Sequence, residues 1–229
     1  MIARLVESRA LSAEIRHFIF EVPEVPALEF RAGQFASLVA DIGGKQVTRA
    51  YSLAAPPAGN RFELCLNLVA DGAFSPTLFA MQPGDTVTCP GILGTFVLRE
   101  PVRETVFVAT GTGIAPFRGM LMDAFARGLT QPFTLIFGAR YEHGLVFAEE
   151  FRAMAECREN FRFLPALTRP EPGWTGATGR VQPLLLDRIG ERRDLDVYLC
   201  GMKVMVDETR QLLKARGFDR KQIIVEKYD

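Results

Sequence analysis

Short apolar runs follow one another from residue 2 to about residue 98, with turn residues between them. Within the run at residues 62–70, for example, Phe62, Leu64 and Leu66 alternate with other side chains. A period of two predicts strands with one buried face, and many short strands in succession predict a β-barrel or a β-sandwich. The runs lie at residues 2–8, 14–22, 34–42, 47–55, 62–70, 85–90 and 95–98.

One segment of this half has a different pattern. Residues 75–81 begin with Ser75 and Pro76, which are residue types common at helix starts. We therefore expect a short helix here, capped by Ser75.

After Glu100 and Pro101, near-continuous apolar runs alternate with segments of helical spacing. Unbroken apolar strands between helices are typical of a parallel sheet that is covered on both faces. One amphipathic helix includes Phe117–Phe125, and a second, near residues 204–216, stops at Gly217. The predicted strands lie at residues 105–109, 133–139, 161–167 and 196–200.

The 229 residues are enough for two domains of ordinary size. We place the boundary at the change of pattern, which gives a β domain over residues 1–100 and a nucleotide-binding type of α/β domain over residues 101–229.

The composition limits the classes of partner and of catalytic site that the chain can have. The 27 basic and 27 acidic residues balance, so the net charge suggests neither nucleic acid nor an anionic membrane as a partner. Four separate cysteines and only two histidines favour neither a metal centre nor a catalytic triad. The sequence shows neither a long apolar stretch nor a secretory leader pattern, so we expect a cytoplasmic protein. We also expect a bound cofactor to carry its chemistry.

The residues Thr110–Pro116, with the sequence TGTGIAP, follow a predicted strand and open a predicted helix. Glycines let a backbone approach a pyrophosphate, and Pro116 fits the first turn of a helix, where its missing N–H is not needed. We expect Thr112 and Gly113 to contact such an anion. A simple tight turn is the alternative, because the motif lacks the full dinucleotide-binding glycine pattern.

Arg49-Ala50-Tyr51-Ser52 ends a predicted strand of the first domain. Alternation places Arg49 and Tyr51 on one face, where a cation and an aromatic ring suit a phosphate and a flat ring. The alternative is a tyrosine of the barrel wall beside a surface arginine.

Several residues of the second half lie where strands end on the ligand side of an α/β sheet. Cys200 and Gly201 close one run, although a single cysteine is often just a core residue. Arg140 follows the run at residues 133–139, and Thr168 and Arg169 follow the run at residues 161–167. Guanidinium groups suit the 2′-phosphate of NADPH, and NADH is the alternative.

Five motifs in this order resemble the ferredoxin–NADP(+) reductase superfamily along the whole chain. They are Arg49-Ala50-Tyr51-Ser52, Gly72-Ala73-Phe74-Ser75-Pro76-Thr77-Leu78, Gly111-Thr112-Gly113-Ile114-Ala115-Pro116, Cys200-Gly201 and Glu226-Lys227-Tyr228. The resemblance implies an N-terminal antiparallel β-barrel that holds FAD and a C-terminal parallel-sheet domain that binds NAD(P)H.

The resemblance also implies roles for single residues. Arg49 would contact the flavin pyrophosphate, Tyr51 the isoalloxazine ring, and the Ser52 hydroxyl flavin N5. The loop at Gly72 and the helix start at Ser75 would receive the pyrophosphate.

In the second domain the resemblance places Cys200 beside the nicotinamide and Glu226 in the positioning and proton network. Tyr228 would cover the flavin, although Asp229 follows it here, and a frayed chain end is the alternative.

The expected function is electron transfer between NADPH and a separate carrier such as ferredoxin or flavodoxin. Flavin takes up a hydride and releases electrons singly, and the chain has no cysteine spacing for its own [2Fe–2S] cluster. Free flavin or a cytochrome is an alternative acceptor. The protein could instead be the NADH-dependent reductase of a multicomponent oxygenase, or a flavoprotein subunit that relays electrons without independent turnover. The oligomeric state is left open.

Overall fold

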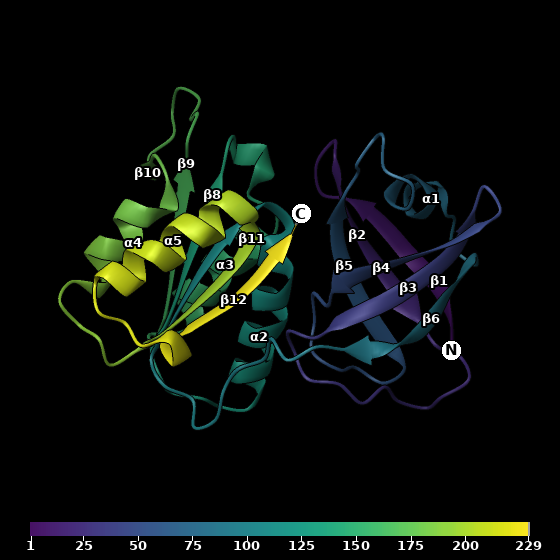
Figure 1. Cartoon of the computed structure of the whole chain (residues 1–229), viewed down its shortest axis with the longest axis horizontal. Coiled ribbons are helices and arrows are strands. Elements are labelled where there is room, and N and C mark those ends of the chain that lie inside the picture. Colours follow the sequence, from purple (N-terminus) through teal and green to yellow (C-terminus); the bar gives the residue numbers. More distant parts are fainter. Residues whose placement is uncertain (229) are drawn as a thin grey trace. The chain divides into compact units, whose positions relative to one another are not determined.

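A computed structural model describes residues 1–228, which form two compact units. The first contains Met1–Leu98 together with Ala115–Gly128, and the second contains Arg99–Ile114 together with residues 129–228. Each unit is built on one six-stranded sheet (Figure 1).

The sheet of the first unit is antiparallel. Its strands are β1 (Ile2–Ala10), β2 (Ile15–Glu21), β3 (Phe35–Ile42), β4 (Lys45–Ser52), β5 (Arg61–Asn67) and β6 (Thr86–Leu93). They pair in the order β4-β3-β6-β1-β2-β5. An isolated antiparallel bridge joins Leu53, just after β4, to Leu64 of β5, so the two outer strands meet. This closure makes the sheet a barrel, as expected.

The alternation along the strands places aromatic side chains inside the barrel. Phe18, Phe20 and Phe62 are fully buried. Phe20 and Phe62 are paired residues on β2 and β5, and their rings stack with centroids 5.4 Å apart. Such cross-strand aromatic pairs stabilise the sheet and hold the register of β2 against β5.

Helix α1 (Ser75–Ala80) forms where a helix is predicted, but the predicted cap is wrong. Phe74, not Ser75, occupies the N-cap position. Ser75 is the first helical residue, and its Oγ accepts a hydrogen bond of 2.9 Å from the backbone N–H of Val69. The serine therefore ties the preceding loop to the helix start instead of capping the helix.

The strand predicted at residues 95–98 is also wrong, because this segment is irregular in the structure. Phe96 and Leu98 are buried and Val97 is only partly so, which imitates the alternation of a strand. The burial has another cause: the ring of Phe96 packs against Phe117 of helix α2 (Ile114–Ala126), with centroids 5.8 Å apart.

The sheet of the second unit is entirely parallel. Its strands are β7 (Thr105–Thr110), β8 (Phe133–Ala139), β9 (Phe161–Leu167), β10 (Ala177–Thr178), β11 (Asp196–Met202) and β12 (Ile223–Tyr228). The order is β10-β9-β8-β7-β11-β12. The chain thus builds outward from β7 in one direction and then returns to its other side with β11. In open parallel sheets, the crevice at such a reversal is where ligands bind.

Helices cover both faces of this sheet. The second unit contributes α3 (Ala148–Cys157), α4 (Val181–Ile189) and α5 (Lys203–Ala215). Leu185 of α4 and Val206 of α5 belong to one buried cluster with β7, β8 and β11, whereas Phe151 of α3 packs on Phe163 of β9. Helix α5 stops before Gly217, whose φ of 84° suits a glycine. Within residues 1–228, none of the helices combines the length and apolarity that a membrane span requires.

Candidate functional site

The end of β4 presents a cation and an aromatic ring. The Arg49 side chain is exposed, and within residues 1–228 it forms no ion pair with an acid. Tyr51, two residues on and therefore on the same face, is half-buried, with its ring 6.0 Å from that of Phe74. Burial raises the pKa of Tyr51 to about 12, and this exceeds the opposing effect of the Arg49 charge. The phenol is therefore neutral at physiological pH and its hydroxyl can donate a hydrogen bond.

Two more residues of this motif differ in exposure. Ala50 points away from the face of Arg49 and Tyr51, because neighbouring strand residues alternate. Ser52, the last residue of β4, is only 7% exposed. A buried hydroxyl at a strand end is held in one place, which suits a group that must meet a cofactor atom.

The loop before α1 approaches this strand end through Phe74. The backbone N–H of Gly72 donates to the carbonyl oxygen of Val69 at 2.8 Å, and Ser75 binds the N–H of the same valine. A Cβ on Gly72 would lie 2.9 Å from the Val69 carbonyl oxygen, so the tight turn excludes other residues. Gly72 and Ser75 thus shape the loop, and their predicted contact with a pyrophosphate stays a prediction.

The predicted nucleotide loop lies at the reversal point of the second sheet. Gly111–Gly113 forms a 3₁₀ turn between β7 and α2, and Pro116 is the third residue of α2, as expected for the first turn. The N–H of Ile114 is bonded within the turn to the carbonyl oxygens of Gly111 and Thr112, so it is not available to a ligand.

Two glycines allow this loop to lie directly against the end of β11. A Cβ on Gly113 would overlap the carbonyl group of Cys200, and a Cβ on Gly201 would lie 2.5 Å from the carbonyl oxygen of Thr110. Gly201 also has a φ of 132°, which other residues rarely adopt. Thr110 Oγ1 completes the junction by accepting a hydrogen bond of 3.2 Å from the N–H of Met202.

The structure brings the three predicted residues at the ends of β11 and β12 together. Cys200 pairs with Glu226 in the parallel register, and its Sγ lies 4.0 Å from Glu226 Oε1. Burial, and next the charge of Glu226, raise the pKa of the Cys200 thiol well above its ordinary value, while a hydrogen bond with Tyr228 acts in the opposite direction. Tyr228 ends β12 opposite Met202, and Asp229 lies outside the described residues.

The exposed ends of β8 and β9 carry the predicted phosphate-binding arginines. The N–H of Arg169 donates to the carbonyl oxygen of Arg140 at 2.9 Å, so the two backbones are directly joined. Thr168 is joined to the end of β8 in the same way, through Ala139 at 3.1 Å. Tyr141 adds an aromatic group here, because Arg169 Nη1 lies 3.4 Å from its hydroxyl.

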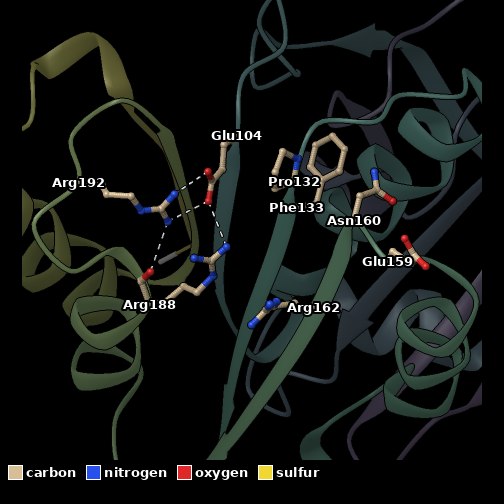
Figure 2. A pocket seen from close by; sticks show the side chains of 8 residues that line it. All are labelled: Glu104, Pro132, Phe133, Glu159, Asn160, Arg162, Arg188 and Arg192. Carbon is tan, nitrogen blue, oxygen red and sulfur yellow. Dashed lines mark hydrogen bonds and ion pairs between the residues drawn. The ribbon is translucent and has the colours of Figure 1, made fainter.

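A pocket at the opposite, amino edge of this sheet has a different character (Figure 2). Glu104 accepts hydrogen bonds from Arg188 and, at both carboxylate oxygens, from Arg192, with distances of 2.7 to 3.1 Å. The cluster ties α4 and the following loop to the start of β7.

Known protein families match both units. The oxidoreductase FAD-binding domain family matches residues 2–98, and the oxidoreductase NAD-binding domain family matches residues 107–211. Ferredoxin–NADP reductase B of Sorangium cellulosum (strain So ce56) is 37% identical over 237 aligned residues, which cover 99% of this chain and 97% of that protein.

The chain belongs to the ferredoxin–NADP(+) reductase superfamily.

The chain is also similar to a longer protein and to a solved structure of about its own length. The toluate 1,2-dioxygenase electron transfer component of Pseudomonas putida is 30% identical over 88% of this chain, but this match covers only 59% of that protein. The crystal structure of a ferredoxin NADP+ reductase from Neisseria gonorrhoeae, with bound FAD and NADP, has a TM-score of 0.86 and 26% identity, with 99% and 98% of the two chains covered.

Membership of the superfamily confirms the two-domain fold and the class of activity. The protein is an oxidoreductase that depends on FAD and uses a nicotinamide nucleotide. The individual contacts assigned to Arg49, Ser52, Cys200 and the other site residues stay predictions.

Sequence reasoning missed three residues that contribute to the geometry. Phe74 packs beside Tyr51, Thr110 bonds to β11, and Tyr141 lies beside Arg169. Tyr141 had a signal, since it is an aromatic residue two positions after a predicted strand end. Phe74 and Thr110 lie within predicted motifs, but no local pattern points to these contacts, because their partners are far along the chain.

Proposed function

We propose that the protein transfers electrons between NADPH and a separate one-electron carrier, such as a ferredoxin or flavodoxin, by way of FAD. The observation that carries this proposal is the paired arginine edge at Arg140 and Arg169, in a chain whose similarity to a ferredoxin–NADP reductase extends over almost its whole length. A comparison of electron donors and acceptors distinguishes this function from the two alternatives, an oxygenase reductase and a relay subunit.

The first unit has residues that fit FAD. Arg49 offers a guanidinium for the pyrophosphate, the neutral Tyr51 offers a ring face and a hydroxyl donor, and Ser52 offers a fixed hydroxyl. The tight loop at Gly72, fastened by Ser75, would receive the phosphates. Bound flavin would supply the ability to accept two electrons as a hydride and to release them one at a time.

The second unit has residues that fit the nicotinamide nucleotide. Thr112 and Gly113 would approach its pyrophosphate at the reversal of the sheet, while Gly201 lets the loop lie close to β11. Buried Cys200, with Glu226 and Tyr228 beside it, would set the position of the nicotinamide. Because its thiol is neutral, Cys200 would act by shape and not as a nucleophile.

NADPH is preferred over NADH in this proposal because of charge. A 2′-phosphate would lie against Arg140 and Arg169, with the Thr168 hydroxyl as a further donor, and charge-assisted hydrogen bonds of this kind are about twice as strong as neutral ones. The ring of Tyr141 adds a flat surface beside them.

The test is a comparison of electron donors and acceptors on the purified protein. We expect two visible absorption bands from bound flavin, reduction of an artificial dye that is faster with NADPH than with NADH, and reduction of a ferredoxin or flavodoxin. A protein without flavin would refute the proposal. A clear preference for NADH would favour the reductase of a multicomponent oxygenase, and inertness with all free carriers would favour the relay subunit.

A further inference from the structure

Helix α2 carries a buried arginine that contacts the barrel. Nη1 of Arg118 donates hydrogen bonds to the carbonyl oxygen of Ala54 and to Oε2 of Glu63, each 2.8 Å long. The same carboxylate oxygen lies 2.8 Å from Nε2 of His17. Arg118 is 9% exposed and His17 is 7% exposed. One carboxylate therefore joins helix α2 to strands β2 and β5.

The backbone held by this cluster is the continuation of the candidate flavin strand. Ala54 lies two residues after Ser52, and its N–H donates to the carbonyl oxygen of Glu63 at 2.8 Å. Gly119 packs on the next residue, since a Cβ there would lie 3.3 Å from the backbone nitrogen of Ala55. Residues 53–55 are thus fixed by β5 on one side and by α2 on the other.

The cluster is costly to assemble, and this argues for a role in precision. Burial alone would raise the pKa of Glu63, but the hydrogen bond from His17 and the charge of Arg118 hold it below its ordinary value. The carboxylate is therefore ionised at neutral pH and paired with Arg118. A buried ion pair often adds little net stability over apolar residues, whereas removal of one partner leaves a buried charge unpaired.

We propose that Glu63 and Arg118 are positioning residues of the flavin site, which fix the backbone after Ser52 and thereby the placement of Tyr51 and Ser52. This inference rests on the proposed assignment of those two residues to the flavin. Reacting groups must be placed to a fraction of an ångström, so a small shift of this strand end would slow electron uptake without emptying the site.

The test measures the limiting rate of flavin reduction at saturating NADPH by stopped flow, on protein saturated with FAD. In Glu63→Gln we expect this rate to fall about tenfold to a hundredfold, together with a change in the visible circular dichroism of the bound flavin. Arg118→Lys keeps the charge but not the geometry, and it should change the rate and the circular dichroism in the same direction. This second variant keeps the test possible if Glu63→Gln does not fold.

The matched control is Glu104→Gln. Glu104 is also a partly buried carboxylate shared by two basic groups, but it lies at the amino ends of the strands in the second unit (Figure 2). This variant should lower the unfolding temperature while the limiting rate stays that of the parent. If Glu63→Gln and Arg118→Lys behave like this control, with lower stability but an unchanged rate and flavin spectrum, the inference is wrong.

Ser52→Ala, measured in parallel, separates the assignment of Ser52 to the flavin from the positioning role of Glu63 and Arg118. A lower rate in Ser52→Ala, with the parent rate in Glu63→Gln and Arg118→Lys, would refute only the positioning role. An unchanged rate in all three variants would refute the assignment of Ser52 to the flavin and the inference with it.

Discussion

The chemistry proposed for single residues depends on how the structure buries them. Ser52 is nearly inaccessible, Tyr51 is half-buried, and Cys200 is fully buried. The two sequence interpretations of Cys200, a core cysteine and a site residue, therefore do not exclude one another. It is part of the core and lies beside Glu226 at a strand end.

Ser52→Ala tests the serine as a group that acts on the flavin. We expect the limiting rate of flavin reduction to fall about tenfold or more, because a fixed hydrogen-bonding group next to the reacting atoms is lost. The FAD content should stay close to that of the parent protein, since Arg49 and Tyr51 remain. The visible spectrum gives the FAD content and stopped flow gives the rate; loss of FAD with a normal rate in the remaining holoprotein would contradict the assignment.

The raised pKa of Cys200 predicts low thiol reactivity. A thiol whose folded pKa lies well above its ordinary value stays protonated across neutral and mildly alkaline pH, so raising the pH to about 8 does not produce the reactive thiolate. Iodoacetamide should label the exposed Cys157 and leave Cys200 unlabelled in the folded protein. Peptide mass spectrometry locates the label.

Cys157→Ser is the control for this experiment. Cys65 and Cys89 are also buried, and burial raises the pKa of Cys65 to about 12. The variant should therefore take up almost no label until it is unfolded. Rapid labelling of Cys200 in the folded variant would show that the environment of this thiol differs from the one described.

At the scale of elements, the junction of β7, its loop and β11 depends on glycine. Gly201→Ala should lower the free energy of unfolding by about 1–3 kcal/mol, the usual range for overpacking, because the new Cβ would strike the backbone of Thr110 at a φ that disfavours alanine. Affinity for the nicotinamide nucleotide should fall as well. Chemical denaturation and nucleotide titration measure the two effects.

Gly91→Ala is the matched control, since a Cβ on Gly91 meets nothing within 4 Å and its φ is not in the left-handed region. It should leave both quantities nearly unchanged. Equal effects of the two substitutions would mean that the close approach of the loop to β11 is not what Gly201 provides.

The ends of β8 and β9 determine the proposed choice of nucleotide. Loss of two charge-assisted contacts in an Arg140→Ala, Arg169→Ala double variant should lower kcat/KM for NADPH about a hundredfold or more and leave the value for NADH much less affected. Arg162→Ala is the control, because this exposed arginine lies on β9 at the opposite end of the strand. An equal fall for both nucleotides would contradict a role in binding the 2′-phosphate.

The element pattern was largely predictable because it depends on local alternation. Period-two runs located the barrel strands, and apolar runs located the four inner strands of the parallel sheet. The errors arose where burial has a distant cause. Phe96 is buried by Phe117 and not by a sheet, and Ser75 binds Val69 instead of capping its own helix.

The same limit applies to the candidate site. Arg49, Tyr51 and Gly113 could be selected because each belongs to a short motif with a physical reason for its spacing. The contact between Glu63 and Arg118 joins residues 55 positions apart, and neither has a local pattern that distinguishes it from a surface charge. Only the folded chain shows that they meet.

At the scale of the whole molecule, the place of α2 in the sequence does not match the unit in which it packs. The helix follows the nucleotide loop in sequence, yet residues 115–128 group with the barrel by their contacts. Arg118 bonds to Glu63, Phe117 packs on Phe96, and Gly119 lies against Ala55. Helix α2 should therefore unfold together with the barrel, although it is encoded after β7.

Hydrogen exchange can test this grouping in the presence and absence of FAD. A ligand that binds only the folded first unit stabilises that unit by about 2.7 kcal/mol when its free concentration is a hundred times its Kd. Amides of α2 that exchange through unfolding should therefore slow on addition of FAD, in parallel with those of β2 and β5. Amides of α4 and α5 serve as the internal reference and should slow much less. If α2 follows α4 and α5 instead of the barrel strands, the contacts of Arg118 do not hold the helix to the first unit in solution.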